Sequence, residues 1–563
     1  MPYFKRLPSD EGFPFNLVPA RRDQLAYRTA RNHFGERVDS ILTVLHRSEL
    51  TYEALMSDFF EYDRQHANSI RGDPVYQMAL QSVRDQFKRV TPIIPLTTGA
   101  VTKGPDFPGA KSPGLPWKLK GYRTKRDVAD DPEAMSAVRK AWYRIGAGAH
   151  VSLPDVSLYA RAQIAKVGET KIRATWGYPF DVYVEEGRFF YPLMEWLKDG
   201  DHDIPIAYGF EMATGGMRAI HNMLCRSHNR AQYMMTDWSR FDKTIPPWLI
   251  KDAFSVLEDL FDFGHVRDSE GLIWHVRAYR SKRRWDRMVN YFVNTPVRTC
   301  KGERFLVSGG VPSGSCFTNI IDTIINMLVT RYCMYQTTGS YPIDEMYLGD
   351  DGVLVVPNIV NIDDIAALAL DKFGMVLNTK KTYLTGLLDN CHFLGYFNHA
   401  GVPFKNQDFL IASFIEPEHT RRTAVEAAAA ALGQLWSTFD PYYAYVWYKI
   451  ILDICDDYSI PHPEVQEHLI AFRFRHKYLQ SVGIDIRKLS FPTPAESMIY
   501  QVMPPSAPRK LIPHHVFDYD AVWHRAWHRW RRDEAAAGAF PGVLHPLLQA
   551  DEADMAANPH ELE

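Results

Sequence analysis

Two separated pairs of acidic residues have the type and the setting needed to bind divalent cations. In "YMMTDWSRFDKTIPPW", Asp237 ends an apolar run and Asp242 follows five positions later. In "EMYLGDDGVLVV", Asp350 and Asp351 lie between apolar segments and are flanked by glycines. Carboxylates from separate strand ends are hard oxygen ligands that suit Mg²⁺. Two such ions can activate an attacking hydroxyl and stabilise a departing oxyanion in phosphoryl transfer.

The elements that must position these acids can be predicted from the surrounding residues. The apolar run before Asp237 predicts a buried strand that delivers one carboxylate at its end. The Gly-Asp-Asp-Gly run between two apolar segments predicts a tight hairpin with Asp350 at its apex, because Asp and Gly accept the required turn dihedrals. We therefore expect the hairpin to lie beside the strand that ends at Asp237.

The bulk composition is that of a large globular protein. The chain has 563 residues, 46% hydrophobic and 13% aromatic, so we expect several structural units and no general disorder. The net charge of −3 does not by itself indicate a nucleic-acid binder, although clustered basic residues could still line a channel. Six cysteines without CxxC spacing predict neither a zinc site nor a disulfide framework, and a reducing, intracellular setting fits them best.

No segment has the pattern of a membrane anchor. The N-terminal "MPYFKRLPSDEG" lacks the apolar run of a signal peptide, and no apolar stretch reaches the roughly 18–20 residues needed to span a bilayer. We therefore expect a soluble protein without a membrane partner.

Several stretches between and beyond the acids are distinctive. The segment 103–126 is rich in Gly, Pro and basic residues interleaved with Trp117 and Tyr122, and it reads either as a solvated loop or as a loop that contacts a nucleic-acid strand. The arginine-rich "RAYRSKRRWDRMVN" predicts a helix with exposed charge. "LVSGGVPSGSCFTNIIDTIIN" predicts a glycine loop that opens a long buried helix. Beyond Phe491, prolines predict a linker or arm, and a Trp/Arg-rich stretch predicts an amphipathic helix.

The ordered stretches resemble the motifs of viral RNA-dependent RNA polymerases. "DWSRFD", "SGGVPSGSCFTNIIDTIIN" and "YLGDDG" resemble palm motifs A, B and C, in that order. "KSPGLPW" and "KIRATWGYP" resemble motifs G and F, and "GMVLNTKKT" and "CHFLGY" resemble motifs D and E. The set covers roughly residues 111–396, and its wording is closest to the partitivirus and picobirnavirus polymerases of double-stranded RNA viruses.

The resemblance implies an α+β fold, the closed right hand of fingers, palm and thumb. Its implied divisions are an N-terminal extension bridging fingers and thumb (1–60), fingers with motifs G and F (61–230), palm motif A (231–245), a fingers insertion (246–305), palm motifs B to E (306–400), a mostly helical thumb (401–500) and a C-terminal extension (501–563).

The implied activity is template-directed RNA synthesis for replication and transcription of a double-stranded RNA viral genome. Asp237 and Asp350 would hold two Mg²⁺ ions, or Mn²⁺ in their place. Asp351 would be an outer ligand, since adjacent strand residues face opposite ways. Lys381 or Lys380 would be the motif D general acid that protonates pyrophosphate. Alternation does not tell which lysine faces inward, and Lys381 is slightly preferred.

The implied nucleotide site contains basic and hydroxyl-binding residues. Lys171 and Arg173, on one face of a strand, would cover the triphosphate. Asp242 would read the ribose, because an acidic acceptor suits a 2′-hydroxyl. Ser313 and Thr318 would add hydrogen bonds in the same pocket.

Asp322 departs from the widespread polymerase pattern, which has asparagine four positions after the motif B threonine. Asn319 and Asn326 lie nearby, so the partner that reads the sugar stays open between these residues. The alternative for Asp322 is a buried acid satisfied by a serine or a backbone group.

The resemblance also implies contacts with RNA and other partners. The residues implied in RNA binding are Ser112, Pro113, Gly114, Lys118, Lys120, Gly310 and Gly314. Implied partners are single- and double-stranded RNA as template and product, ribonucleoside triphosphates and a viral capsid protein. The implied location is the virion interior and the host cytoplasm.

Two other functions share parts of this pattern. A reverse transcriptase has the same two-acid palm but usually places a bulky residue at the ribose edge, whereas Asp242 accepts a 2′-hydroxyl. A catalytically inactive RNA-binding virion protein could retain the fold, although all the expected carboxylates are present. A P-loop enzyme is excluded because the chain has no Gly-Lys dipeptide for a Walker A loop.

Overall fold

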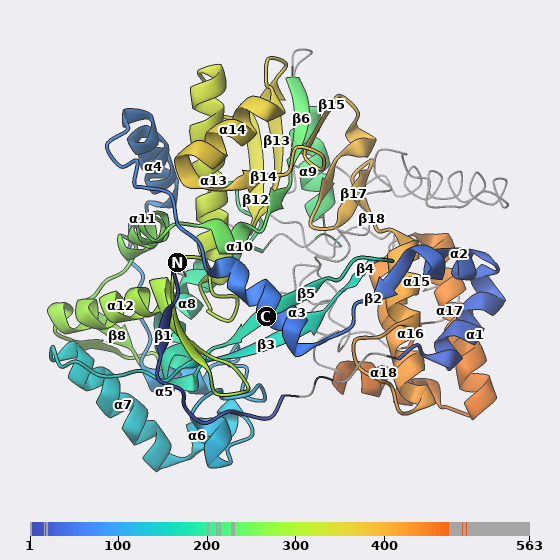
Figure 1. The fold of residues 1–563 in the computed structure, drawn as a ribbon, viewed down its shortest axis with the longest axis horizontal. Coiled ribbons are helices and arrows are strands. Elements are labelled where there is room, and N and C mark those ends of the chain that lie inside the picture. The colour runs from blue at the N-terminus through green and yellow to red at the C-terminus, as the bar shows by residue number, and fades with distance from the viewer. Residues whose placement is uncertain are drawn as a thin grey trace.

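The computed structural model describes residues 3–15, 17, 21–199, 202–209, 212, 215–226, 231–438, 440–471, 487 and 491–492. Helices and strands are mixed along the chain and share a large hydrophobic core (Figure 1). Within these residues, every helix is too short or too polar to cross a lipid bilayer. The predicted C-terminal extension, 501–563, lies outside the described residues.

The acidic stretches belong to one antiparallel sheet with the strand order β12-β13-β6-β15. Its strands are β6 (Ala231–Thr236), β12 (Asp344–Leu348), β13 (Asp351–Pro357) and β15 (Tyr383–Thr385). Leu348 pairs with Asp351, so Gly349 and Asp350 form a two-residue turn, and the predicted hairpin is confirmed. Gly349 takes a left-handed φ of 58°, which a glycine adopts without strain.

A long helix supports this sheet. The helix α13 (Thr318–Thr338) packs against β12 and β13, and the predicted buried helix after the glycine loop is confirmed. The remaining elements around the sheet are β7 (Trp238–Ser239), α10 (Phe241–Thr244), α14 (Ile362–Phe373), β14 (Val376–Leu377), η4 (Leu388–Asn390), β16 (His392–Phe393), β17 (Tyr396–His399) and β18 (Val402–Phe404).

A second sheet joins segments that are far apart in the sequence. Its strand order is β1-β11-β10-β3-β5, with β10 parallel to β3 and the other pairs antiparallel. Its strands are β1 (Lys5–Leu7), β3 (Val156–Ala162), β5 (Ile172–Gly177), β10 (Asn294–Arg298) and β11 (Arg304–Ser308). The two stretches predicted as fingers, 61–230 and 246–305, therefore contribute to one sheet.

Helices and short strands between residues 52 and 293 surround the two sheets. They are α3 (Tyr52–Phe59), η1 (Phe60–Tyr62), α4 (Pro74–Phe87), α5 (Thr98–Lys103), η2 (Trp117–Lys120), α6 (Lys125–Asp130), α7 (Pro132–Gly146), α8 (Phe180–Asp199), α9 (Gly216–Cys225), α11 (Pro247–Glu258), β8 (His265–Arg267), β9 (Ile273–His275) and α12 (Ala278–Val293). The helix predicted from the arginine-rich stretch is α12.

The N-terminal helices pack against the C-terminal ones. They are α1 (Gln24–Phe34), α2 (Arg37–Val44), α15 (Gln407–Ile415), α16 (Ala424–Thr438), α17 (Pro441–Tyr458) and α18 (His462–Ala471), and they group at the right of Figure 1. The Arg37 guanidinium pairs with Asp408 at 2.6 Å. The strand β2 (Leu45–Arg47) pairs with β4 (Ile164–Lys166), and Arg161 pairs with Glu418 at 2.9 Å. The N-terminal segment and the second sheet thus both contact the C-terminal helices, as in a closed hand.

All six cysteines are free thiols, as the spacing predicted.

Candidate active site

The two acidic stretches meet at one end of the β12-β13-β6-β15 sheet. Gly352 of β13 pairs with Thr236 of β6 in antiparallel register, so the next position outward places Asp351 opposite Asp237. Asp350 lies in the turn directly before Asp351, and all three acidic side chains are half-buried. The register therefore confirms that the strand ends carrying these carboxylates converge.

The turn before β15 fixes the end of β6. The N–H of Asp237 donates to Oγ1 of Thr382 at 2.9 Å, and its C=O accepts from the N–H of Asn378 at 2.8 Å. The strand β7, which follows Asp237, pairs with β14. With both backbone groups of Asp237 bonded, its carboxylate leaves the sheet in a defined direction.

A buried amide on α13 connects the acidic turn to the strand opposite. Nδ2 of Asn326 donates to the C=O of Gly349 and to the C=O of Asp351, both at 3.1 Å. Oδ1 of Asn326 accepts from Nε1 of Trp238 at 3.0 Å. A single side chain therefore holds both the turn that carries Asp350 and the residue after Asp237.

The carboxylates fit a cation that arrives with a phosphate substrate. Among the described residues, no three His, Cys, Asp or Glu side chains form a group that could hold a metal ion by themselves. Oδ2 of Asp351 already accepts from the N–H of Leu394 at 3.2 Å. Mg²⁺ usually binds through one or two carboxylates and completes its shell with water and substrate phosphates, so Asp237 and Asp350 supply donors of the right kind.

A half-buried histidine lies close to the acidic end of the sheet. Burial lowers the pKa of His392 to about 4, while the charge of Asp351 acts in the opposite direction. His392 is therefore neutral near pH 7 and adds no positive charge to the carboxylates.

A second cluster joins the three residues predicted around the nucleotide sugar and phosphates. Nη2 of Arg173 donates to Oδ2 of Asp242 at 3.3 Å. Asp322 is only 6% exposed and interacts with the Asp242 carboxylate, while its buried Oδ1 meets no hydrogen-bond partner among the described residues. Burial raises the pKa of Asp322 well above its ordinary value, the charges of Asp242 and Asp350 raise it further, and Arg173 lowers it. These influences favour the protonated form of Asp322, which is a hydrogen-bond donor.

The glycine loop before α13 docks on the segment that carries Asp242. The C=O of Asp242 accepts from the N–H of Val311 at 2.7 Å, and the C=O of Ile245 accepts from the N–H of Gly310 at 2.9 Å. Gly310 has a φ of +70°, and a Cβ there would lie 2.6 Å from the ring of Tyr62. Position 310 therefore requires glycine.

The same loop also presses against the end of β5. Oγ of Ser313 accepts from the N–H of Trp176 at 3.0 Å. A Cβ on Gly314 would lie 1.6 Å from the C=O oxygen of Trp176, so the backbones touch and position 314 also requires glycine. Oγ1 of Thr318 donates to the C=O of Pro312, within the loop itself.

A fully buried glutamate on α8 accepts hydrogen bonds from the end of the glycine loop. Oε1 of Glu186 accepts from the N–H of Cys316 at 3.1 Å, and Oε2 accepts from Oγ of Ser315. Burial raises the pKa of Glu186 to about 8, although these two hydrogen bonds favour its charged form. The adjacent Glu185 differs, because ion pairs with Arg188 and Arg284 outweigh its burial and lower its pKa.

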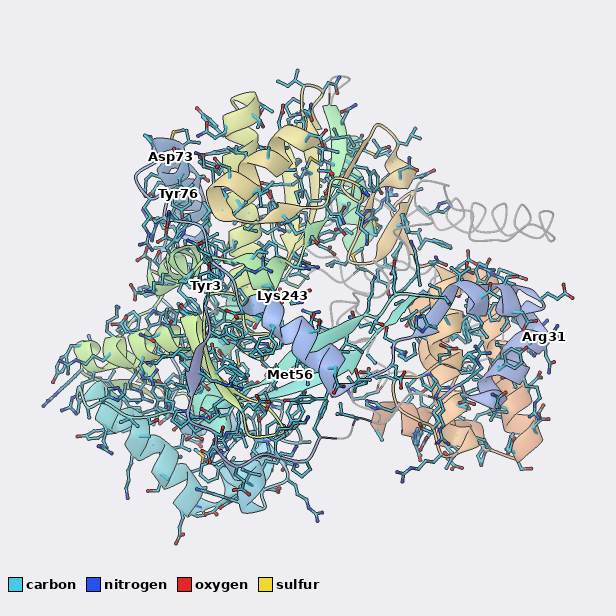
Figure 2. The ribbon with its side chains drawn as sticks, in the orientation of Figure 1. Tyr3, Arg31, Met56, Asp73, Tyr76 and Lys243 are labelled. Atoms are coloured by element: carbon cyan, nitrogen blue, oxygen red, sulfur yellow. The ribbon has the colours of Figure 1, made fainter. Side chains whose placement is uncertain are left out.

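The residue after Asp242 anchors this segment to the N-terminal helix α3. Nζ of Lys243 pairs with Asp58 at 2.5 Å and with Glu61 at 2.9 Å. Figure 2 shows Lys243 at the centre of the molecule, next to α3. The two ion pairs therefore tie Lys243 to the N-terminal segment.

The predicted phosphate-binding cations lie on one face of the chain, with Arg173 in β5 and Lys171 directly before it. Ile172 and Ala174 are buried, whereas Arg173 is exposed and Lys171 is half-buried. The predicted alternation is confirmed, and it directs both basic side chains away from the core.

The two motif D lysines differ in exposure. Lys380 is exposed and Lys381 is half-buried. The N–H of Lys381 bonds to the C=O of Asn378 at 3.2 Å, in the turn that also holds Asp237. This placement favours Lys381 as the lysine closer to the carboxylates.

A family model described as viral RNA-dependent RNA polymerase matches residues 19–405, well over half of the chain. The chain belongs to this polymerase family. The matched range contains every acidic residue of the two clusters, and the family resemblance drawn from the motifs is confirmed.

Individual relatives agree with the family. The chain is 24% identical over 308 residues to the RNA-directed RNA polymerase of White clover cryptic virus 1, covering 52% of this chain and 50% of the relative. It is 27% identical over 353 residues to that of Cryptosporidium parvum virus 1, covering 59% and 63%. The match thus spans between half and two thirds of these curated relatives.

A solved polymerase shares the fold. The crystal structure of the RNA-dependent RNA polymerase of a human picobirnavirus matches with a TM-score of 0.57 and 15% identity, covering 93% of this chain and 95% of that chain. The predicted α+β right-hand polymerase fold is confirmed.

The residues that resemble motif G lie against the end of β5. The C=O of Pro113 accepts from the N–H of Phe180 at 2.8 Å, and a Cβ on Gly114 would lie 2.8 Å from the C=O oxygen of Tyr178. Ser112 is exposed. The contact orients the loop beside motif F, while its role in RNA binding stays a prediction.

The basic residues that follow are partly engaged within the protein. Nζ of Lys118 donates to the hydroxyl of Tyr159 at 2.7 Å. Lys120 is exposed, with Nζ 5.0 Å from the centre of the Trp117 ring. Trp117 is buried, and its Nε1 donates to Asp181 at 2.6 Å. The Trp117 ring therefore belongs to the core, and whether the segment 103–126 contacts RNA stays a prediction.

Sequence reasoning missed Asn326 and Glu186 as supports of the site. A signal for Asn326 was present, because Asn319, Asp322 and Asn326 recur at positions i, i+3 and i+7 and so form a polar stripe on one face of an apolar helix. Oδ1 of Asn319 accepts from the hydroxyl of Tyr208 at 2.6 Å. No comparable sequence signal distinguishes Glu186 from Glu185.

Proposed function

We propose that this chain synthesises RNA on an RNA template, joining ribonucleoside triphosphates to the 3′-hydroxyl of a growing strand. The observation that carries the proposal is the register that sets Asp351 opposite Asp237, with Asp350 in the adjoining turn. Membership of the polymerase family and similarity to two named RNA-directed RNA polymerases support it.

The carboxylates would assemble the reacting groups. Two Mg²⁺ ions, or Mn²⁺ in their place, would activate the 3′-hydroxyl and neutralise the charge of the phosphates. Asp237 and Asp350 would be their ligands from the protein, with Asp351 as an outer contributor. Most of the rate enhancement would then come from positioning and charge neutralisation.

The basic residues would bind the triphosphate and protonate the pyrophosphate that leaves. Lys171 and Arg173 face outward from β5, where a guanidinium can bind a phosphate in a bidentate manner and an ammonium acts as a point charge. Arg173 pairs with Asp242, and a triphosphate would compete for it. Lys381 would protonate the leaving pyrophosphate.

The acid pair would read the ribose. In its protonated form Asp322 would donate to Asp242, which would leave the remaining lone pairs of the Asp242 carboxylate to accept from a sugar hydroxyl. Ser313 and Thr318 would support this pocket by holding the glycine loop in place.

The motif resemblance supports a proposal for the biological setting. The motifs resemble those of double-stranded RNA virus polymerases, and the chain is similar to the polymerases of White clover cryptic virus 1 and of a human picobirnavirus, so we assign to it replication and transcription of such a genome. Its partners would be template and product RNA and a capsid protein, and its location the virion interior and the host cytoplasm.

The test is nucleotide incorporation by the full chain on an RNA template with Mg²⁺, comparing ribonucleotides with deoxyribonucleotides. The proposal expects incorporation of ribonucleotides in strong preference, abolished by Asp350→Asn. A preference for deoxyribonucleotides would indicate a reverse transcriptase. RNA binding without any incorporation would indicate an inactive RNA-binding protein.

A further inference from the structure

The arginine-rich helix α12 has a set of cations that the catalytic site does not use. Nη2 of Arg284 pairs with the buried Glu185 at 2.5 Å, which fixes this arginine in the fold. Lys282 pairs with Glu258 and also with Asp286. Lys282 and Arg284 therefore have acidic partners within the protein, which the arginines described next do not.

Three arginines at the start of α12 pack on exposed rings instead of acids. The guanidinium carbon of Arg280 lies 5.3 Å from the centre of the Tyr143 ring, and that of Arg283 lies 5.3 Å from the centre of the Tyr279 ring. Nη1 of Arg277 donates to the hydroxyl of Tyr279 at 3.4 Å. We call Tyr143, Arg277, Tyr279, Arg280 and Arg283 the Tyr–Arg surface.

The rings of this surface remain open to solvent. Tyr143 is 63% exposed and Tyr279 is 52% exposed, even though each has a guanidinium over it. Each tyrosine has an arginine neighbour that holds it. Tyr143 lies on α7 beside Arg280 of α12, and Tyr279 lies at the start of α12 beside Arg277 and Arg283. The two rings are thus pre-positioned with more than half of their surface free.

The surface is also a local concentration of uncompensated positive charge. Within the described part of the chain, none of Arg277, Arg280 and Arg283 forms an ion pair with an acid. Hydrogen bonds from Arg277 and Arg280 lower the pKa of the Tyr279 hydroxyl. A chain with a net charge of −3 therefore presents a cationic surface here.

A further exposed ring precedes the surface in the sequence. Leu272, Ile273 and Trp274, at the start of β9, are each more than half exposed. Nε1 of Trp274 donates to Asp268 at 2.8 Å, which fixes the indole in its exposed position. Three exposed rings thus lie on α7, α12 and the hairpin that leads into α12.

The surface is separate from the catalytic carboxylates. Figure 1 shows α7, α12 and β8 together at the left of the molecule, away from β6, β12 and β13. The Tyr–Arg surface is therefore not a wall of the active site.

We propose that the Tyr–Arg surface is an accessory binding site for single-stranded RNA. Guanidinium groups bind phosphate oxygens with charge-assisted hydrogen bonds. Exposed rings stack on bases of any sequence, and a cationic groove or patch with rings is the usual platform for a single strand. The proposal extends beyond RNA synthesis at the catalytic carboxylates and requires no catalysis.

An acidic protein segment is the competing ligand class. It would complement the three arginines but would make little specific use of two exposed tyrosine faces. The rings therefore favour RNA, and separate removal of rings and charges distinguishes the two ligands.

The test measures binding of a fluorescent 12-nucleotide uridine RNA to the full chain, without nucleotide or Mg²⁺. The chain is first saturated with an unlabelled primer–template duplex that occupies the catalytic channel. One variant removes the rings (Tyr143→Leu with Tyr279→Leu) and another removes charge (Arg280→Gln with Arg283→Gln). The matched control, Arg6→Gln with Arg226→Gln, makes the same charge change at two exposed arginines elsewhere.

The proposal expects the ring variant, which removes two stacking faces, to weaken RNA binding about 30-fold or more. It expects the charge variant to reduce the salt dependence, the slope of log K against log salt, by about 1.4, which corresponds to two phosphate contacts. The control should match the wild type. Equal RNA affinity in the wild type, the two variants and the control would overturn the proposal. So would a second result, in which the charge variant loses affinity for a polyglutamate peptide while the ring variant binds RNA as tightly as the wild type.

Two further measurements keep the outcome clear. Single-nucleotide extension of a short primer–template should be unchanged in both variants, which reports that the fold is intact. Should a variant fail to fold, cross-linking of a 4-thiouridine RNA to the wild-type chain decides, and adducts confined to peptides outside α7, β9 and α12 would refute the site. Because the binding assay contains no Mg²⁺, it can succeed even where RNA synthesis fails.

Discussion

Asn326 offers a sharp test of how the acidic turn is held. The change Asn326→Asp keeps the shape of the side chain and the acceptor for Trp238, but it removes the two N–H groups that reach Gly349 and Asp351. It also brings a carboxylate oxygen toward two carbonyl oxygens. Each buried carbonyl left without its donor costs about 1–3 kcal/mol, so we expect the folded protein to lose roughly 2–6 kcal/mol of stability.

The loss of activity should exceed what unfolding explains. The turn carries Asp350, and a shift of about 1 Å in a reacting group can cost about 100-fold in rate. We therefore expect kcat for nucleotide incorporation to fall by about that factor at a temperature where Asn326→Asp is still folded. KM for the nucleotide should change little, because Arg173 and Asp242 are untouched.

The assay pairs urea unfolding, followed by tryptophan fluorescence, with steady-state incorporation. The matched control is Asn319→Asp on the same helix, which keeps the oxygen that accepts from Tyr208 and should unfold at the wild-type urea concentration. The reasoning is refuted if Asn326→Asp unfolds with the control and retains wild-type kcat.

Three other predictions concern protons. Burial raises the pKa of Glu186 to about 8 from an ordinary 4.5, so its contribution to stability is present below pH 4.5 and is lost as the pH rises toward 8. The free energy of unfolding of Glu186→Gln should therefore rise relative to that of the wild type by up to about 4 kcal/mol over that range. A difference in urea midpoint between the two proteins that stays constant from pH 5 to 8.5 would contradict this. Asp322→Asn supplies a permanent donor to Asp242 and should keep the rate of ribonucleotide incorporation within about threefold of the wild type at pH 7. Asp322→Ala should lose the preference for ribonucleotides over deoxyribonucleotides. Equal behaviour of the two variants in a competition assay would count against a protonated acid. Lys381→Ala should lower kcat by about 100-fold or more while the exposed Lys380→Ala stays near wild type in single-turnover kinetics, and the reverse order would reassign the general acid.

The strand ends were predictable because their determinants are local. Asp237 follows an apolar run, and the Gly-Asp-Asp-Gly run contains the residues that a tight turn requires. The facing of Lys171 and Arg173 also followed from alternation alone, since Ile172 between them is buried.

The supports of the site were not predictable in the same way, because their partners lie far away in the sequence. Glu185 and Glu186 are adjacent on one helix, yet one pairs with arginines and the other meets Ser315, 129 residues further along the chain. The buried position of Trp117 likewise depends on Asp181, which lies on α8, 64 residues further along the chain. Local composition suggested an exposed ring there, and tertiary packing overrode it.

The central claim is that Asp237 and Asp350 jointly hold two divalent cations over the phosphates of a nucleotide. The most direct measurement is an anomalous difference map from crystals of the full chain with RNA, a non-hydrolysable nucleoside triphosphate and Mn²⁺. We predict two peaks about 3.5–4 Å apart, bounded by the carboxylates of Asp237 and Asp350 and by the triphosphate. Peaks elsewhere, or none between these two side chains, would contradict the account.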